Sequence, residues 1–250
     1  MNDWLDDLRT AVAFLTRLPM PHPQGAMPVH FVRAHRAFPL VGAAIGGAVG
    51  LLCLALRAIG LPDLAAAALA LGASALLTGA LHEDGLADVA DGFGGGRDVA
   101  AKLEIMRDSR LGTYGALILM VSFVAKLSAL AALPDGYVVQ SLVAAHALGR
   151  GVLPFMAMSL DYARKDGLAA NAGRPDSATA LTAGAIAVLI ALVALPWRDA
   201  LGAALVAAAC AIGMAWLARR QIGGQTGDVL GGAEQLGETA ILLLLAARFA

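Results

Sequence analysis

Three aspartates that follow the second apolar stretch of the chain have the types and the spacing for metal chemistry. If the preceding helix continues through them, Asp84, Asp88 and Asp91 stand at i, i+4 and i+7 and share one face. Carboxylates so close repel each other, and more so at a helix C-terminus, where the dipole favours cations. Oxygen ligands without cysteine suit Mg²⁺, which typically binds one or two carboxylates and substrate phosphates. We therefore expect a Mg²⁺ site here; the alternative is a solvated acidic helix end.

The residues on either side of the aspartates each have two interpretations. His82 is either a substrate contact that accepts a proton or a hydrogen-bonded structural residue. Gly94 and Gly95 belong to a glycine-rich run whose backbone can approach a phosphate closely and present N–H groups to it. A plain flexible turn explains the same run equally well. The loop expected over residues 82–110 therefore combines carboxylates with a candidate phosphate cradle.

A basic stretch closes this loop. Arg107 and Arg110 are three residues apart, and their forked guanidinium groups can meet one phosphate together. Asp108 lies between them, either as a further metal ligand or base, or as the residue that orients an arginine. Anchoring at the membrane interface explains one of the two arginines without any ligand. We expect both arginines to neutralise substrate phosphates.

A second polar loop is expected over residues 219–235. Asp228 is its candidate metal ligand or general base, and Thr226 is a candidate substrate contact two residues earlier. Lys126 and Arg150 stand inside otherwise apolar runs. Ionisable residues inside membrane helices are usually paired or functional, so we expect Lys126 to bind substrate and Arg150 to assist at the phosphates.

The helices that position these residues are expected to lie in a lipid bilayer, because the chain is too apolar for a soluble fold. Of the 250 residues, 59% are hydrophobic and only 15% are charged. A bilayer helix needs about 20 apolar residues, and the apolar runs cover residues 38–59, 64–81, 111–133, 138–160, 178–195 and 200–217, with a shorter one at 236–250. We predict an all-α, polytopic membrane bundle of six or seven helices. A net charge of −1 gives no reason to expect nucleic acid as a partner.

Lys and Arg residues are distributed unevenly between the two sides of this bundle. The long connections 1–37, 82–110, 161–177 and 219–235 contain 13 of the 18, and the connections on the opposite side keep only Arg57, at the end of a span, and Arg198. The positive-inside rule therefore predicts a multi-pass protein of the inner membrane, with its N-terminus and active-site loops in the cytoplasm. We expect one integral membrane domain over residues 1–250, with residues 1–37 as a cytoplasmic or interfacial segment.

These motifs together resemble those of the cobalamin synthase family, the adenosylcobinamide-GDP ribazoletransferases. The resemblance covers nearly the whole chain and rests on residues 38–42, 81–92, 104–113 and 226–228. One departure is Glu83, where the family more often has an apolar residue. The resemblance implies an enzyme that joins adenosylcobinamide-GDP to α-ribazole or its 5′-phosphate and releases GMP. It leaves open which ribazole is preferred, and the sequence leaves open whether the protein is a homo-oligomer.

The resemblance also assigns roles to the residues above. Asp84, Asp88 and Asp91 would hold Mg²⁺ against the pyrophosphate, while arginines neutralise its oxygens. Asp228 or Asp108 would serve as base for the attacking hydroxyl. The rival interpretations are a CDP-alcohol phosphotransferase, an intramembrane prenyltransferase and, less well supported, a transporter. A transporter would place carboxylates near the bilayer midplane, whereas these are expected at helix ends and in loops.

Overall fold

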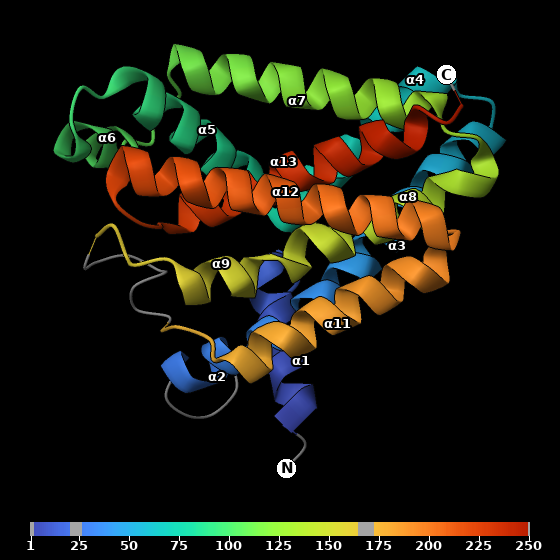
Figure 1. Cartoon of the computed structure of the whole chain (residues 1–250). Helices are drawn as coiled ribbons and strands as arrows, with labels where there is room; N and C mark the ends of the chain where they lie inside the picture. The colour runs from blue at the N-terminus through green and yellow to red at the C-terminus, as the bar shows by residue number, and fades with distance from the viewer. Residues whose placement is uncertain (1–2, 21–26, 165–172, 250) are drawn as a thin grey trace.

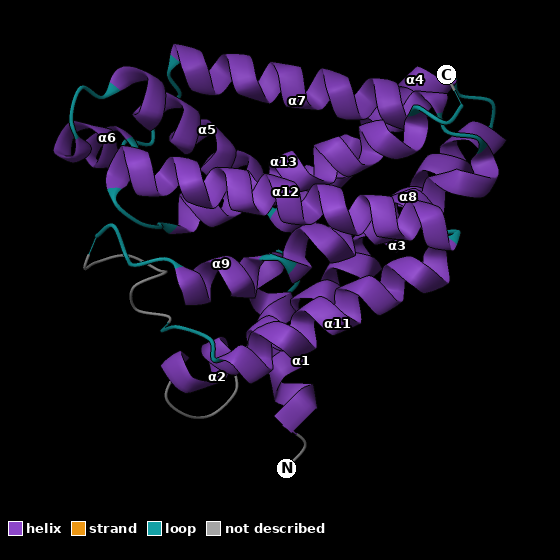
Figure 2. Cartoon of the chain, in the orientation of Figure 1, coloured by secondary structure: helices purple, strands orange, loops and turns teal. Residues whose placement is uncertain are grey.

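Helices make up the fold. The computed structural model describes residues 3–20, 27–164 and 173–249. Within these ranges the regular elements are helices, accompanied by one isolated bridge between Tyr162 and Gln225. In chain order they are α1 (Asp3–Leu15), α2 (Met27–Ala34), η1 (His35–Ala37), α3 (Phe38–Ala58), α4 (Asp63–Thr78), α5 (Leu81–Gly95), α6 (Val99–Ile105), α7 (Thr113–Ala132), α8 (Asp135–Gly151), α9 (Leu153–Ser159), α11 (Ser177–Ala194), α12 (Trp197–Ile222) and α13 (Gly227–Ala246). The predicted all-α class is confirmed (Figure 2).

Several of these helices are long and apolar enough to cross a bilayer. In the described part of the chain, 6 segments qualify: Phe31–Ala58, Thr113–Ala132, Asp135–Ser159, Ser177–Ala194, Trp197–Ile222 and Gly227–Ala246. The pair α4 and α5 adds a seventh candidate, which is bent by 90° at its break. Figure 1 shows α7, α12 and α11 crossing the molecule in the same general direction. The prediction of a polytopic helical membrane protein is therefore confirmed.

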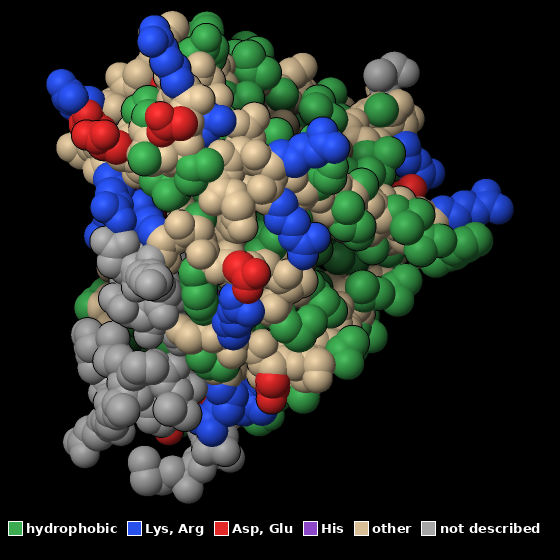
Figure 3. Space-filling view, turned by 60° about the vertical axis from the view of Figure 1, so that its left-hand side comes forward, with side chains coloured by type: hydrophobic (Ala, Val, Ile, Leu, Met, Phe, Trp, Pro, Cys, Tyr) green, Lys and Arg blue, Asp and Glu red, His purple; other side chains and the backbone are tan. Residues whose placement is uncertain are grey.

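The helices divide into an inner and an outer set. In α8 and α13 most of the apolar span is buried inside the bundle, 78% and 72% respectively, against 28% for α7, α11 and α12. The outer helices instead expose large apolar side chains, among them Val121, Val124, Leu189, Val193, Leu205 and Ile212. Figure 3 shows broad apolar areas on the surface that such side chains form. Lipid tails are the solvent that suits this surface.

Glycines allow the inner helices to approach each other closely. Gly42, Gly46 and Gly50 recur every four residues along α3 and face α8. A Cβ at Gly42 or Gly46 would collide with the backbone of α8, and one at Gly50 would lie 2.8 Å from the Cα of Val139. Small residues at this spacing are a common means of close helix packing in membranes. The contact between α3 and α8 is accordingly the most extensive in the molecule.

The helix before the aspartates does not continue through them, so this expectation was wrong. α4 ends at Gly79, and both Gly79 (φ 68°) and Ala80 (φ 54°) adopt left-handed backbone conformations, which glycine tolerates well. α5 then starts in a new direction and carries all three aspartates, still on one helix. Asp84 lies in the first turn of α5, where the helix dipole favours a negative charge rather than opposing it.

The two expected functional loops are also mostly helical. Residues 82–110 form the remainder of α5 and then α6, and residues 219–235 form the end of α12 and the start of α13. The true connection between α12 and α13 is residues 223–226 alone. One span boundary differs as well, because α13 begins at Gly227 instead of near residue 236. The span expected over 138–160 is found as Asp135–Ser159, made of α8 and α9.

The N-terminal helices pack against the bundle through a buried acid. Asp7 on α1 is fully buried and accepts hydrogen bonds from Arg33 (2.8 Å) and Arg36 (2.6 Å). The guanidinium of Arg36 also lies 4.0 Å from the ring centre of Trp4. Part of the predicted cytoplasmic or interfacial segment is therefore docked onto the bundle; residues 1–2 and 21–26 of it lie outside the described ranges.

Candidate active site

The acidic site forms where α5 crosses α13. Gly85 faces the start of α13, and a Cβ there would lie 2.9 Å from the backbone oxygen and 3.0 Å from the Cα of Asp228. Gly231, on the same face of α13, approaches the backbone of His82 in the same way, at 3.2 Å. Because no side chain separates the two helices at this crossing, Asp228 comes next to the aspartates of α5.

Three other carboxyl groups thereby lie within electrostatic range of Asp88. The carboxyl group of Asp88 is half-buried, and those of Asp228, Asp84 and Asp91 all act on it electrostatically. Asp84 is exposed and Asp91 is buried. The structure therefore joins the two acidic motifs that are 137 residues apart between Asp91 and Asp228. Crowded carboxylates with few cations beside them are the oxygen-rich donor set that a hard divalent cation prefers.

Arg164 also belongs to this acidic site, although its charge counted above only toward the membrane orientation. Arg164 lies 3.4 Å from Asp228, and its Nη1 atom is buried without a hydrogen-bond partner among the described residues. Two backbone bonds hold its segment beside α13: Ala163 N–H donates to the Gln225 carbonyl (2.9 Å), and Gln225 N–H to that of Asp161 (2.7 Å). No sequence pattern signalled this pairing.

Thr226 holds the carboxylate of Asp228 in place. Its hydroxyl caps α13, accepting from Val229 N–H at 3.3 Å, and it donates to the Asp228 carboxylate at 3.1 Å. Threonine at an N-cap fixes the first turn of a helix. Thr226 is itself almost fully buried, so its side chain orients Asp228; a contact with substrate remains a prediction.

Asp91 on α5 is hydrogen-bonded to the backbone at the beginning of α7. Its two carboxylate oxygens accept hydrogen bonds from the backbone N–H groups of Gly112 and Gly115, each at 2.8 Å. A carboxylate is stabilised at the positive end of a helix in this way. Both oxygens thus have partners, although each keeps a further lone pair that a metal can use. The role of Asp91 as a ligand stays a prediction.

The glycine run is a packing surface. Gly94 and Gly95 lie in the last turn of α5 rather than in an open loop, so neither the expected cradle conformation nor a flexible turn is found. A Cβ at Gly94 would lie 2.7 Å from the ring of Tyr114, which explains why glycine is needed there. Whether either glycine contacts substrate remains a prediction.

The basic stretch after α6 is exposed. Asp108 accepts hydrogen bonds from the Arg110 side chain (Nε, 2.9 Å) and backbone (3.0 Å), and these bonds lower the pKa of Asp108 to about 2. This geometry matches the interpretation in which Asp108 orients an arginine. Arg107 and Arg110 both lie at the surface, on the segment whose following residues are held by Asp91. Their phosphate contacts remain predictions.

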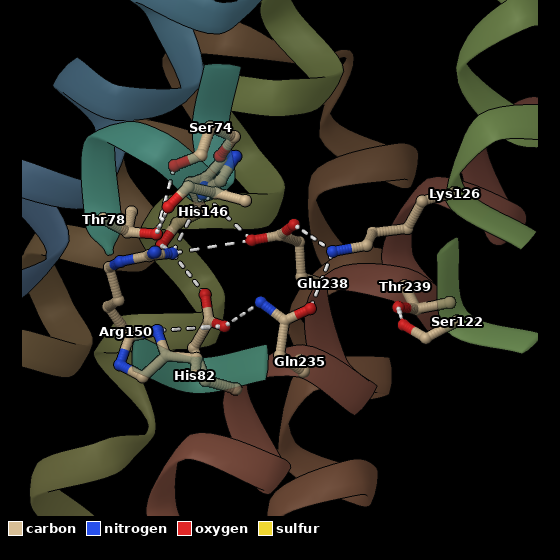
Figure 4. Close-up of polar contacts among 12 residues, drawn as sticks. Ser74, Thr78, His82, Ser122, Lys126, His146, Arg150, Gln235, Glu238 and Thr239 are labelled. Carbon is tan, nitrogen blue, oxygen red and sulfur yellow. Dashed lines mark hydrogen bonds and ion pairs between the residues drawn. The ribbon is translucent and has the colours of Figure 1, made fainter. Parts of the chain in front are cut away.

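Lys126 and Arg150 meet in a buried polar cluster instead of facing open solvent (Figure 4). Lys126 donates to Gln235 (2.6 Å) and to Glu238 (3.2 Å). Arg150 donates to Glu234 and to His146 Nδ1 (3.0 Å), and His146 Nδ1 lies 2.9 Å from Glu238. Both residues are thus paired, which is one of the two expectations for ionisable groups in membrane helices.

His82 reaches the same buried cluster. Its Nδ1 atom lies 3.2 Å from the Glu234 carboxylate, although not in hydrogen-bond geometry. It is almost fully buried, which favours the structural interpretation of this histidine. Glu234, Gln235 and His146 were not singled out from the sequence. A usable signal existed, since His146 and Arg150 on one apolar helix and Glu234 and Glu238 on another are each four residues apart.

Two groups of residues are therefore candidates for a metal. Among the described residues, His146, Glu234 and Glu238 are the one group of three whose ligand atoms all lie within 4.8 Å of one another, and the aspartates are more widely spaced. There, however, Lys126 and Arg150 already supply two positive charges against the two glutamates, so a divalent cation is disfavoured. The crossing of α5 and α13 has four aspartates, and the cation that acts on Asp88 and Asp228 there is Arg164. The negative charges of this site are therefore less fully balanced than those of the buried cluster. The acidic site fits Mg²⁺ better.

Comparison with known proteins gives consistent matches along the chain. A family model described as cobalamin-5-phosphate synthase matches residues 7–246. A protein of Bradyrhizobium diazoefficiens named adenosylcobinamide-GDP ribazoletransferase is 47% identical over 96% of this chain and 93% of its own length. Proteins of the same name from a Sinorhizobium species (44% identical, 98% of both chains) and Azorhizobium caulinodans (42%, 96% and 94%) are similar to it as well. No solved structure matches the chain significantly.

Proposed function

This chain belongs to the cobalamin-5-phosphate synthase family, and from that premise we propose that it is a Mg²⁺-dependent adenosylcobinamide-GDP ribazoletransferase. The enzyme joins adenosylcobinamide-GDP to α-ribazole or its 5′-phosphate, which is the late nucleotide-loop assembly step of cobalamin synthesis. The observation that carries the metal requirement is the placement of three aspartates within electrostatic range of Asp88 at the crossing of α5 and α13. This donor set has the chemistry that a Mg²⁺–diphosphate complex needs.

The reaction is a displacement at phosphorus. A hydroxyl oxygen of the ribazole attacks the cobinamide-linked phosphorus, the bond from that phosphorus to the bridging oxygen breaks, and GMP leaves. When bound, Mg²⁺ supplies charge neutralisation to the diphosphate and the leaving group. Catalysis of such transfers is mostly positioning and electrostatics, so the residues need to hold the diphosphate in place and accept one proton.

The residues divide this work. Asp84, Asp88 and Asp91 would hold the metal, and Asp228 would complete the set or accept the proton of the attacking hydroxyl. Arg164, buried against Asp228, and the exposed Arg107 and Arg110 neutralise phosphate oxygens. Thr226 keeps Asp228 in place from the helix cap. We place the substrates on the cytoplasmic side of the inner membrane, where the Lys- and Arg-rich connections are expected.

Product analysis tests this function. Detergent-purified protein is mixed with adenosylcobinamide-GDP, α-ribazole and Mg²⁺, and GMP and the corrinoid product are identified by mass spectrometry. We expect GMP and adenosylcobalamin in equal amounts, none after EDTA treatment, and recovery when Mg²⁺ is added back. Equal turnover with and without EDTA would disprove the metal requirement, while the absence of transfer in Mg²⁺ would disprove the assigned reaction. Supplying ribazole phosphate in parallel shows which acceptor is preferred.

A further inference from the structure

Glu234 is the centre of the buried polar cluster. It is fully buried, and its carboxylate is contacted from three sides: by Arg150 of α8, by His82 of α5 at 3.2 Å, and by the neighbouring Gln235 amide at 3.0 Å. Gly149 of α8 also allows close approach, since a Cβ there would lie 3.2 Å from Glu234 Oε1. Figure 4 shows His82, Arg150 and Gln235 converging from different helices.

The same two helices that meet at Glu234 carry the acidic site. His82 precedes Asp84 by two residues on α5, and Glu234 follows Asp228 by six on α13. The glycine contacts at Gly85 and Gly231 bring the helices together but supply no polar bond that selects one register. A buried charge contacted from several helices suits that purpose, because a shift of α5 would separate His82 from Glu234 and a shift of α13 would separate Glu234 from Arg150.

The wider cluster joins these helices to the rest of the bundle. Arg150 belongs to the deeply buried α8, and Lys126 of α7 is bonded to Gln235 and Glu238 on α13. Two glutamates and two permanent cations balance each other, so every charge in the set depends on the others for compensation. α13 is thereby tied to α5, α7 and α8 at one level.

We propose that Glu234, held by Arg150, is a positioning residue that sets the distance between Asp228 on α13 and Asp84 and Asp88 on α5. On this proposal Arg150 acts through Glu234 instead of touching the substrate phosphates. The inference deepens the proposed function, since the distance it concerns is that between the Mg²⁺-binding carboxylates. A carboxylate set that is displaced by about 1 Å binds its metal and catalyses much less well.

The main test compares Glu234→Gln with Ser122→Ala. Ser122 is a matched control because it also makes a polar contact to α13, at 3.0 Å to Thr239, and among the described residues it has no hydrogen bond to α5 or to Glu234. We expect Glu234→Gln to raise the Mg²⁺ concentration that gives half-maximal GMP release by about tenfold to a hundredfold. Ser122→Ala should leave that concentration unchanged. An unchanged Mg²⁺ dependence in folded Glu234→Gln would overturn the proposal.

A second readout needs neither metal nor turnover. Spin labels at Gly95→Cys and Gly227→Cys, with Cys53 and Cys210 replaced by alanine, report the distance between α5 and α13; at Gly227 a Cβ meets nothing within 4 Å. Pulsed electron paramagnetic resonance should give a broader or shifted distance distribution for Glu234→Gln than for wild type or Ser122→Ala. Identical distributions in all three would also refute the proposal. If wild type ignores EDTA, the magnesium function fails, yet this measurement still decides the positioning role.

Glu234→Gln leaves Arg150 without its main partner and can therefore fail to fold. The double variant Glu234→Gln, Arg150→Gln removes both charges and leaves no unpaired ion of this pair. We expect it to elute as folded protein in detergent and still to show the weakened Mg²⁺ dependence. Wild-type Mg²⁺ dependence in the double variant would show that the pair serves stability alone.

Discussion

The carboxyl group of Asp88 lies within electrostatic range of those of Asp84, Asp91 and Asp228. Replacing Asp88 by asparagine keeps the shape and removes one negative charge from the donor set. We expect Asp88→Asn to lower GMP release by about a hundredfold or more, because a neutral amide is a poor ligand for Mg²⁺. The assay is turnover at saturating Mg²⁺, with gel filtration in detergent to show that the protein is folded. Wild-type turnover would exclude Asp88 as a ligand.

Arg164 offers a separate test of charge neutralisation. Its guanidinium is fixed beside Asp228 by the backbone bonds at Gln225, and Arg164→Gln removes the cation but retains hydrogen-bond capacity. We expect kcat to fall by about a hundredfold, as when one donor to a developing charge is lost. Arg164→Lys should recover part of the rate, since lysine restores the positive charge but not the paired N–H donors of a guanidinium group.

The control for that prediction is Arg220→Gln. Arg220 is an exposed arginine at the end of α12 whose guanidinium lies 4.3 Å from the ring centre of Trp216, away from any aspartate of the site. Its replacement should leave kcat unchanged. Equal losses in both variants would mean that Arg164 acts only as one of many surface charges.

Residue types and spacing predicted the aspartates of α5 because three carboxylates on one helix face need no knowledge of the tertiary fold. Asp228 was predicted as a further ligand or base from its place in the second polar loop, but the close helix crossing at Gly85 that brings it beside α5 could not be read from the sequence. Arg164 escaped notice for the same reason: its role depends on the bridge at Gln225. Lys126 and Arg150 stood out as charges in apolar runs, but Glu234 did not, because it was assigned to a loop that is in fact helix.

At the scale of elements, the close approach of α5 and α13 makes a sharp prediction. Gly85→Ala puts a methyl group 2.9 Å from the backbone of Asp228, so one helix has to move. We expect the variant to lose about 1–3 kcal/mol of stability, as overpacked sites do, and to lose most of its transferase activity. Thermal unfolding in detergent and GMP release measure the two effects.

Gly72→Ala is the matched control for Gly85→Ala. Gly72 lies inside α4, and a Cβ there meets nothing within 4 Å. Alanine should therefore keep full activity and stabilise the helix by about 0.5–1 kcal/mol. If Gly85→Ala behaves like Gly72→Ala, close helix contact is not required at the site.

Element type was easier to predict from this sequence than element boundaries. Long apolar runs identify membrane helices reliably, and the spans appeared near their expected positions. The helical nature of the polar segments was missed because glycine and aspartate favour loops in soluble proteins. Here tertiary contacts override that preference: Gly94 packs on Tyr114, and Asp91 binds the start of α7. The break at Gly79 depends on a left-handed backbone that periodicity does not reveal.

At the scale of the whole molecule, the acidic site and the buried cluster are parts of one arrangement. α13 carries Asp228 near its beginning and Glu234 and Glu238 deeper in the bundle, while α5 contributes aspartates to one and His82 to the other. Most of these charges belong to α5, α8 and α13, with Lys126 pointing inward from α7, and the outer helices present apolar side chains to the surface. A protein built in this way can keep a polar reaction site at a membrane surface while its scaffold stays in lipid.

The orientation of this scaffold decides which compartment supplies the substrates. Gly227, beside Asp228, and Gly136, in the first turn of α8, are both exposed positions where a Cβ meets nothing within 4 Å, so cysteine is tolerated at each. The distribution of Lys and Arg predicts that the two lie on opposite sides of the inner membrane. In a background without Cys53 and Cys210, a membrane-impermeant maleimide should label Gly136→Cys in intact spheroplasts and Gly227→Cys only after permeabilisation. Labelling of Gly227→Cys in intact spheroplasts would place the acidic site outside the cytoplasm, where its nucleotide-activated substrate is not expected.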